Sequence, residues 1–155
     1  GLPFADAALV LEWHVLGMFV PGFFSGYLIK RFGVLAVMGV GVLLNLVCIA
    51  VALSGVELMQ FLVALFTLGV GWNFLFVGGS TLLTQAYRPE EKIKTQGAMD
   101  FCVFTTMVVT SFASGALITT RGWDWLNYGS LPVVLLIAIA LLWLAAKRRH
   151  TVATA

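Results

Sequence analysis

Ionisable side chains inside strongly apolar stretches are the residues of this sequence best able to do chemistry. Glu12 and His14 lie in an apolar stretch that begins near Ala7, and Asp100 lies near the start of another. A charged group inside a hydrocarbon layer is costly unless it is paired or hydrated, so each of these residues is a candidate for function. Proton relays within membranes use Asp, Glu or His, and this makes His14 a candidate for lining a polar path.

Glu12 and His14 do not serve one site together. They are two residues apart, which places them about 200° apart around a helix. His14 shares a face with Pro21 and Ser25, whereas Glu12 shares the more interfacial setting of Trp13. We therefore predict that His14 lines a cavity, and a hydrated or hydrogen-bonded structural role is the alternative for both residues.

A second group of candidates lies along one polar stripe. Asn73, Ser80 and Thr84 follow one another at spacings of seven and four, so they share a helix face. Trp72 adds an aromatic surface on which a ring-bearing substrate can stack. Trp72, Asn73, Phe76 and Ser80 are the predicted cavity residues here, and polar contacts between helices are the alternative.

Two further patterns favour helix packing. Gly22 and Gly26 form a Gly-x-x-x-Gly pair beside Pro21, which predicts a close helix crossing and a kink. Hydroxyl groups recur at intervals of four in a later stretch, where Ser and Thr commonly bond their own backbone. These hydroxyl residues are Thr106, Thr110 and Ser114.

The sequence offers little for metal or nucleophilic chemistry. His14 and His150 are its two histidines, and Cys48 and Cys102 both lie in apolar stretches without ligand spacing. No His-Glu-x-x-His, Gly-x-Ser-x-Gly or Cys-x-x-Cys pattern occurs. We predict no metal and no cofactor, and the short basic clusters do not form the broad patch that nucleic acid requires.

Composition shows what must hold these residues in place. Hydrophobic residues make up 61% of the 155-residue chain and charged residues only 10%, against about 25% in soluble domains. An α-helix needs about 20 apolar residues to cross a bilayer. Five stretches satisfy this length, so we predict an all-α membrane unit over residues 1–155. The approximate spans are 7–29, 34–53, 58–83, 98–119 and 128–146.

Basic residues alternate between the connections, as expected when Lys and Arg gather in cytoplasmic loops. Eight of the nine follow the first, third or fifth span, and Arg121 is the exception. The eight are Lys30, Arg31, Arg88, Lys92, Lys94, Lys147, Arg148 and Arg149. This pattern predicts an outer start for the first helix and a cytoplasmic C-terminus. Trp123, Trp125 and Tyr128 would form an outer aromatic belt.

The junction of the first two spans carries a recognisable motif. Gly26-Tyr27-Leu28-Ile29-Lys30-Arg31-Phe32-Gly33 resembles the loop signature of the major facilitator superfamily, Gly-x-Leu-x-Asp-Arg-x-Gly, with Lys30 at the acidic position. The stretches 14–21, 71–73 and 82–90 also look like bacterial members of the superfamily. The degraded motif and the number of spans resemble helices eight to twelve of such a transporter.

That resemblance implies a part of a C-terminal bundle whose seventh helix and N-terminal half lie outside this chain. It implies gating roles for the kink at Pro21 and for Gly26. It also implies a cytoplasmic latch in which Asp100 pairs with Arg31 or Arg88, although a carboxylate near a helix start is also favoured by the helix dipole. Lys30 stands where the family signature has an acidic residue.

The functional expectation is a fragment of a secondary transporter that moves a small solute by alternating access. Its partners would be the lipid bilayer, the missing N-terminal half and a small-molecule substrate that the sequence does not identify. Its expected location is the bacterial inner membrane. A non-transporting membrane scaffold is the alternative, and a membrane-embedded enzyme is a weaker one.

Overall fold

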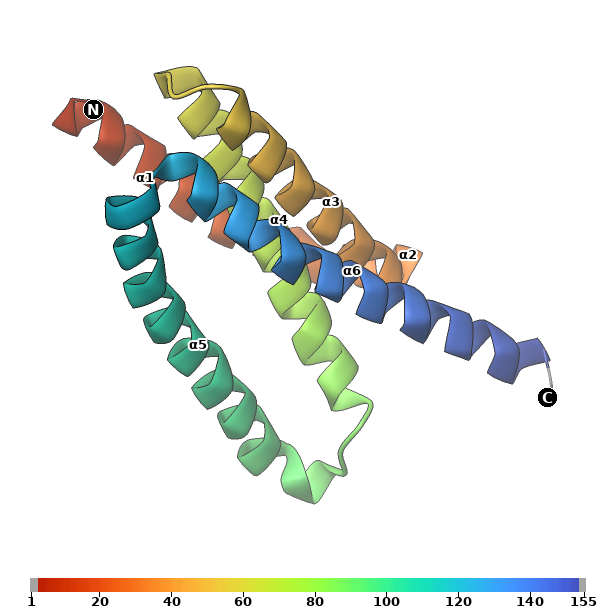
Figure 1. Cartoon of the computed structure of the whole chain (residues 1–155). Coiled ribbons are helices and arrows are strands. Elements are labelled where there is room, and N and C mark those ends of the chain that lie inside the picture. Colours follow the sequence, from red (N-terminus) through yellow and green to blue (C-terminus); the bar gives the residue numbers. More distant parts are fainter. Residues whose placement is uncertain (1–2, 154–155) are drawn as a thin grey trace.

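The computed structural model describes residues 3–153, without the side chains of 149–153, and this part of the chain is helical with no strand. Figure 1 shows long helices crossing at oblique angles. The helices are α1 (Phe4–Phe19), α2 (Gly22–Phe32), α3 (Val34–Ser54), α4 (Leu58–Thr84), the short 3-10 helix η1 (Pro89–Glu91), α5 (Lys92–Arg121) and α6 (Trp123–Ala153). The predicted all-α class is confirmed.

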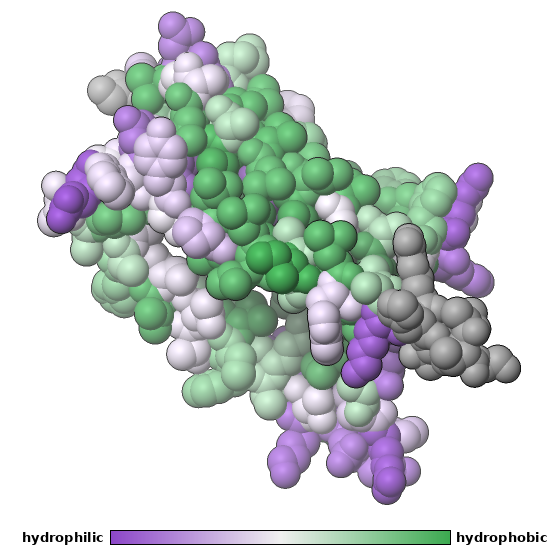
Figure 2. All heavy atoms as spheres, turned by 45° about the vertical axis from the view of Figure 1, so that its right-hand side comes forward, coloured by the Kyte–Doolittle hydropathy of each residue, from purple (hydrophilic) through white to green (hydrophobic). Residues whose placement is uncertain are grey.

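Four of these helices are long and apolar enough to cross a membrane, namely α3, α4, α5 with its short leading turn, and α6. The paired helices α1 and α2 pass the same test together and are bent by 41° where they meet, so they count as a fifth candidate span. Figure 2 shows hydrophobic surface across the middle of one face, with hydrophilic groups gathered at its ends. This distribution suits a protein surrounded by lipid.

Glycines mark two of the sharp connections between helices. Gly33 separates α2 from α3 with φ +88°, and Gly122 separates α5 from α6 with φ +89°. This left-handed region is costly for a residue that carries a Cβ atom. The chain therefore reverses direction in a single residue at both places.

Helix α4 lies between α1 and α3 and packs against both (Figure 1). Small residues allow the close approach to α3, since a Cβ atom on Gly71 would lie 2.9 Å from the Gly41 carbonyl oxygen. Apolar side chains gain little by leaving lipid for another helix, so close packing at small residues must hold such helices together. Helices α1, α3 and α4 thus form the tightly packed part of the molecule.

Helix α6 packs against α3. Val42 and Ile49 of α3 form a buried cluster with Val134 of α6. Near the start of α6, the indole N–H of Trp123 donates to the Ala52 carbonyl oxygen at 2.8 Å, and its ring packs edge-on against Phe61 at 5.1 Å. The N-terminal end of α6 is therefore fixed to α3 and α4.

Helix α5 is the least packed of the long helices, and it buries no residue. It diverges from α4 after the turn that joins them and meets α6 near Gly122 (Figure 1). Most side chains of α5 are therefore exposed in this structure.

Candidate functional site

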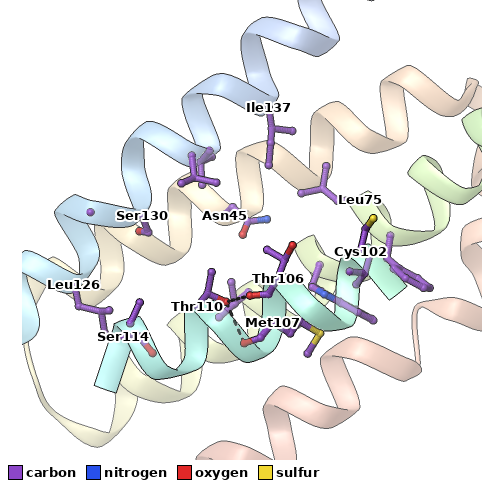
Figure 3. A pocket seen from close by; sticks show the side chains of 18 of the residues that line it. Asn45, Leu75, Cys102, Thr106, Met107, Thr110, Ser114, Leu126, Ser130 and Ile137 are labelled. Atoms are coloured by element: carbon purple, nitrogen blue, oxygen red, sulfur yellow. Dashed lines mark hydrogen bonds between the residues drawn. The ribbon is translucent and has the colours of Figure 1, made fainter. Parts of the chain in front are cut away.

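A cavity of about 810 Å³ lies between α4, α5 and α6, with α3 contributing one wall residue. Its volume falls within the range of about 300 to 1,000 Å³ that is typical of small-molecule sites. The lining is mainly apolar, with a few polar side chains from three helices (Figure 3). Those polar residues are Asn45, Thr106, Thr110, Ser114 and Ser130.

Two predicted cavity residues form an aromatic surface on the α4 wall. Trp72 and Phe76 are one helical turn apart, and their rings stack with centroids 4.9 Å apart and an angle of 7° between the planes. Both side chains are half-buried and line the cavity. Parallel rings of this kind present a flat apolar face to a planar ligand.

The polar groups of the cavity mostly satisfy their donors within their own helices. Asn45 Nδ2 donates to the Gly41 carbonyl oxygen at 2.8 Å, and Thr110 Oγ1 donates to the Thr106 carbonyl oxygen at 2.8 Å (Figure 3). Ser130 Oγ donates to its own helix in the same way. The amide oxygen of Asn45 and the hydroxyl lone pairs remain as acceptors. The cavity is therefore suited to a solute that carries O–H or N–H donors.

His14 occupies a different place from the cavity. Its Nδ1 atom lies 2.7 Å from the carbonyl oxygen of Leu65, so the ring links α1 to α4. A carbonyl oxygen only accepts hydrogen bonds, and Nδ1 therefore carries the hydrogen. Glu12, two residues earlier, is exposed on the other side of α1. His14 thus makes a structural hydrogen bond, which was the alternative to cavity lining for this residue.

The polar stripe of α4 divides among three surroundings. Asn73 is buried and turned toward α1 and α2, where it bonds the Met18 carbonyl oxygen and Ser25. Ser80 Oγ lies 3.4 Å from Gln96 Oε1, at the long limit for a hydrogen bond, near the turn into α5. Thr84 bonds its own helix. Trp72 and Phe76 face the cavity, whereas Asn73 and Ser80 do not line it.

Comparison with known proteins identifies the family. The sequence profile of the Major Facilitator Superfamily matches residues 1–155. This chain belongs to the major facilitator superfamily. It is therefore an integral membrane protein of a transporter family.

Three curated relatives give this membership more detail. The riboflavin transporter RfnT of Brucella anthropi is 41% identical over 136 residues, which is 88% of this chain and 34% of that protein. Two uncharacterised transporters of the superfamily from Bacillus subtilis, YddS and YdeG, are 26% and 28% identical over 90% and 84% of this chain, respectively. The chain thus spans about a third of the length of its curated relatives. No solved structure matches it.

The superfamily latch predicted from Asp100 is not formed in this structure. Within the described residues Asp100 is exposed and makes no ion pair with Arg31 or Arg88. Arg31 instead donates to the Tyr27 hydroxyl at 3.0 Å and lies over the Phe32 ring. The backbone N–H of Arg88 bonds Glu91 in the turn before α5.

Sequence reasoning missed the polar link between the ends of α4 and α6. Arg148 Nη2 donates to Gln85 Oε1 at 2.9 Å across 63 residues. Arg148 was assigned to the cytoplasmic basic cluster by its position beside an apolar span, which does not identify its partner. The shared membrane side of the two helix ends was the one signal for this contact.

The glycine pair of the motif region has unequal surroundings. A Cβ atom on Gly22 would lie 3.3 Å from Asn73 Nδ2. A Cβ atom on Gly26 would have no neighbour within 4 Å beyond its own helical turn in the part of the chain that the structure describes. The predicted close crossing therefore involves Gly22 and excludes Gly26 in this conformation. The gating role of Gly26 stays a prediction.

Proposed function

We propose that this chain is part of a secondary transporter that carries a planar, ring-bearing organic solute of the riboflavin class across a membrane by alternating access. The observation that carries the proposal is the stacked pair of Trp72 and Phe76 on the wall of a cavity of solute size. The relative named as a riboflavin transporter supports the solute class. The acceptor groups of the cavity suit the hydroxyl and ring N–H donors of such a solute.

In this proposal the cavity binds the solute and performs no chemical change on it. The aromatic pair on α4 stacks on the ring system, and Asn45 accepts a hydrogen bond from a polar substituent. The rest of the binding surface belongs to the N-terminal half of the transporter, since such proteins bind at the interface of their repeats. The protein is not an enzyme.

The proposed orientation follows from the basic residues. Lys30, Arg88 and Lys147 begin three clusters that lie on one side of the bilayer if the chain crosses it five times. Cytoplasmic loops carry the excess of Lys and Arg, which supports a cytoplasmic C-terminus. The three relatives come from bacteria, which supports the bacterial inner membrane as the location.

Uptake of riboflavin by proteoliposomes that contain the complete protein tests this function. Trp72→Ala should raise the riboflavin concentration for half-maximal uptake about two- to twelvefold, because a lost aromatic contact of this kind costs about 0.5 to 1.5 kcal/mol. Trp143→Ala is the matched control, since Trp143 is 64% exposed on α6 and lies outside the cavity. Absence of saturable uptake by the unaltered protein would refute the proposed solute, and equal behaviour of the two variants would refute the proposed site.

A further inference from the structure

The joint between α1 and α2 lacks a continuous backbone ladder. Pro21 has no N–H group, so it cannot donate to the Gly17 carbonyl oxygen as a helical residue would. The hydrogen bonding of the next turn also departs from the α-helical pattern. The Phe23 N–H donates to the Val20 carbonyl oxygen, three residues back instead of four, at 3.3 Å. The two helices meet there at a bend of 41°.

A side chain from α4 takes over one of the carbonyl groups that the break releases. In a continuous helix the Gly22 N–H would bond the Met18 carbonyl oxygen, and the described backbone has no such bond. Asn73 Nδ2 donates to that oxygen instead, at 2.8 Å. Asn73 is only 5% exposed, and the absence of a side chain on Gly22 leaves room for its amide.

Ser25 gives the joint two alternative bonding arrangements. Its side chain is fully buried, and Oγ lies 2.5 Å from Asn73 Oδ1 and 2.8 Å from the Pro21 carbonyl oxygen. A hydroxyl group has one hydrogen, so it can fully bond only one of these acceptors at a time. A bond to Asn73 joins α2 to α4, whereas a bond to Pro21 stays within the first turn of α2.

The two arms of the joint are held with very different strength. On α1, His14 bonds the Leu65 carbonyl oxygen, and a Cβ atom on Gly69 would lie 2.5 Å from the His14 carbonyl oxygen. On α2, Ser25 is the one buried residue, and the helix ends at the positive-φ Gly33. Helix α1 is therefore the fixed arm on α4, and α2 is the arm that can rotate.

From this geometry we infer that Asn73 is a positioning residue that latches the α1–α2 joint in its bent state. In the released state the Met18 carbonyl oxygen accepts from the Gly22 N–H, the Ser25 hydroxyl bonds Pro21, and α2 rotates toward the axis of α1. Coupling of this exchange to solute movement rests on the proposed transport function. The latch itself is a property of the fold and can be tested without transport.

Distances between spin labels in the complete protein in nanodiscs test the latch directly. One label replaces Phe32 at the end of α2 and the other replaces Thr84 at the end of α4, both at exposed positions on the same side of the bundle. At 1.5 Å per residue α2 is about 16 Å long, so a rotation through half of the bend moves its end by about 6 Å. Asn73→Leu should add a second population to the distance distribution, shifted by up to about 6 Å.

Companion variants separate the latch from general damage to the fold. Ser25→Ala removes one bond of the latch and should broaden the distance distribution. Thr81→Val is the matched control, because the Thr81 hydroxyl bonds only the Val77 carbonyl oxygen of its own helix, and it should match the unaltered protein. If Asn73→Leu does not fold, Ser25→Ala and Gly22→Ala decide the question. Unchanged distributions in every folded latch variant would overturn the inference.

Uptake measurements then separate the two proposals. If the latch serves transport, Asn73→Leu should lower the maximal uptake rate about tenfold while changing the half-saturating concentration by less than about twofold, because Asn73 does not line the cavity. If the unaltered protein takes up no riboflavin, the proposed solute fails and the label distances still decide the latch. If the distances shift and the rate does not, the coupling of the latch to transport is refuted.

Discussion

At the residue scale, close approach between helices depends on single glycines of α4. Gly69 faces α1 at a place where a Cβ atom would lie 2.5 Å from the His14 carbonyl oxygen and 3.0 Å from the Met18 nitrogen. Gly79 is ten residues later on the same helix, and among the described residues no atom beyond its own helical turn lies within 4 Å of the corresponding position. Both residues are helical glycines with the same intrinsic helix propensity, so the two positions form a matched pair for substitution by alanine.

We expect Gly69→Ala to destabilise the protein and Gly79→Ala to leave its stability equal or slightly higher. The added methyl group at Gly69 meets backbone atoms that cannot rotate away, and overpacking of this kind costs about 1 to 3 kcal/mol. At Gly79 the change meets open space and gains helix propensity. Thermal unfolding of the purified protein in one detergent compares the two variants. An equal melting temperature for both would contradict the close contact of α1 with α4.

Single residues also show where sequence reasoning succeeds and where it stops. Trp72 was a predicted cavity residue for its aromatic surface and Phe76 for its place on the polar stripe, and both side chains line the cavity. The same reasoning grouped Asn73 and His14 with them, but these two bond neighbouring helices. Spacing along a helix fixes which residues share a face and leaves open which neighbour covers that face.

At the element scale, α5 combines a long apolar stretch with an absence of buried residues. The sequence predicted a span over residues 98–119. In the structure α5 runs from Lys92 to Arg121, so it begins earlier and includes charged residues before the predicted span. The apolar length could be anticipated because the hydrocarbon layer sets it. The divergence of α5 from α4 could not, since it depends on packing partners that the sequence pattern does not identify.

The cysteines provide a test of the α5 wall. Cys102 lines the cavity and is exposed, whereas Cys48 is buried in the packed region of α3. A small membrane-permeant thiol reagent should therefore modify Cys102 at least tenfold faster than Cys48, because thiol reactivity requires access. Mass spectrometry of the labelled protein measures both rates. Saturating riboflavin should slow the modification of Cys102, and equal labelling with and without the solute would argue against the cavity as its site.

At the scale of the whole molecule, hydropathy and charge predicted the architecture, whereas at single sites they did not identify which residues are in contact. The all-α class and the superfamily follow from apolar stretches, a loop motif and alternating basic clusters, and the profile match confirms the family. The kink beside Pro21 was also predicted, and the structure gives it an angle of 41°. The tight packing of α4 between α1 and α3 was not predicted, because hydropathy does not identify which helices are neighbours. We propose that the chain crosses the bilayer five times and has its clusters of basic residues on one side.

Sidedness of labelling tests that claim most directly. In a Cys102→Ala background, single cysteines replace Asp124 in the first turn of α6 and Glu90 in the short turn before α5, both at exposed positions. A membrane-impermeant maleimide applied to intact cells should label position 124 and should reach position 90 only after the cells are opened. Labelling of both positions from the same side would contradict the five-span topology.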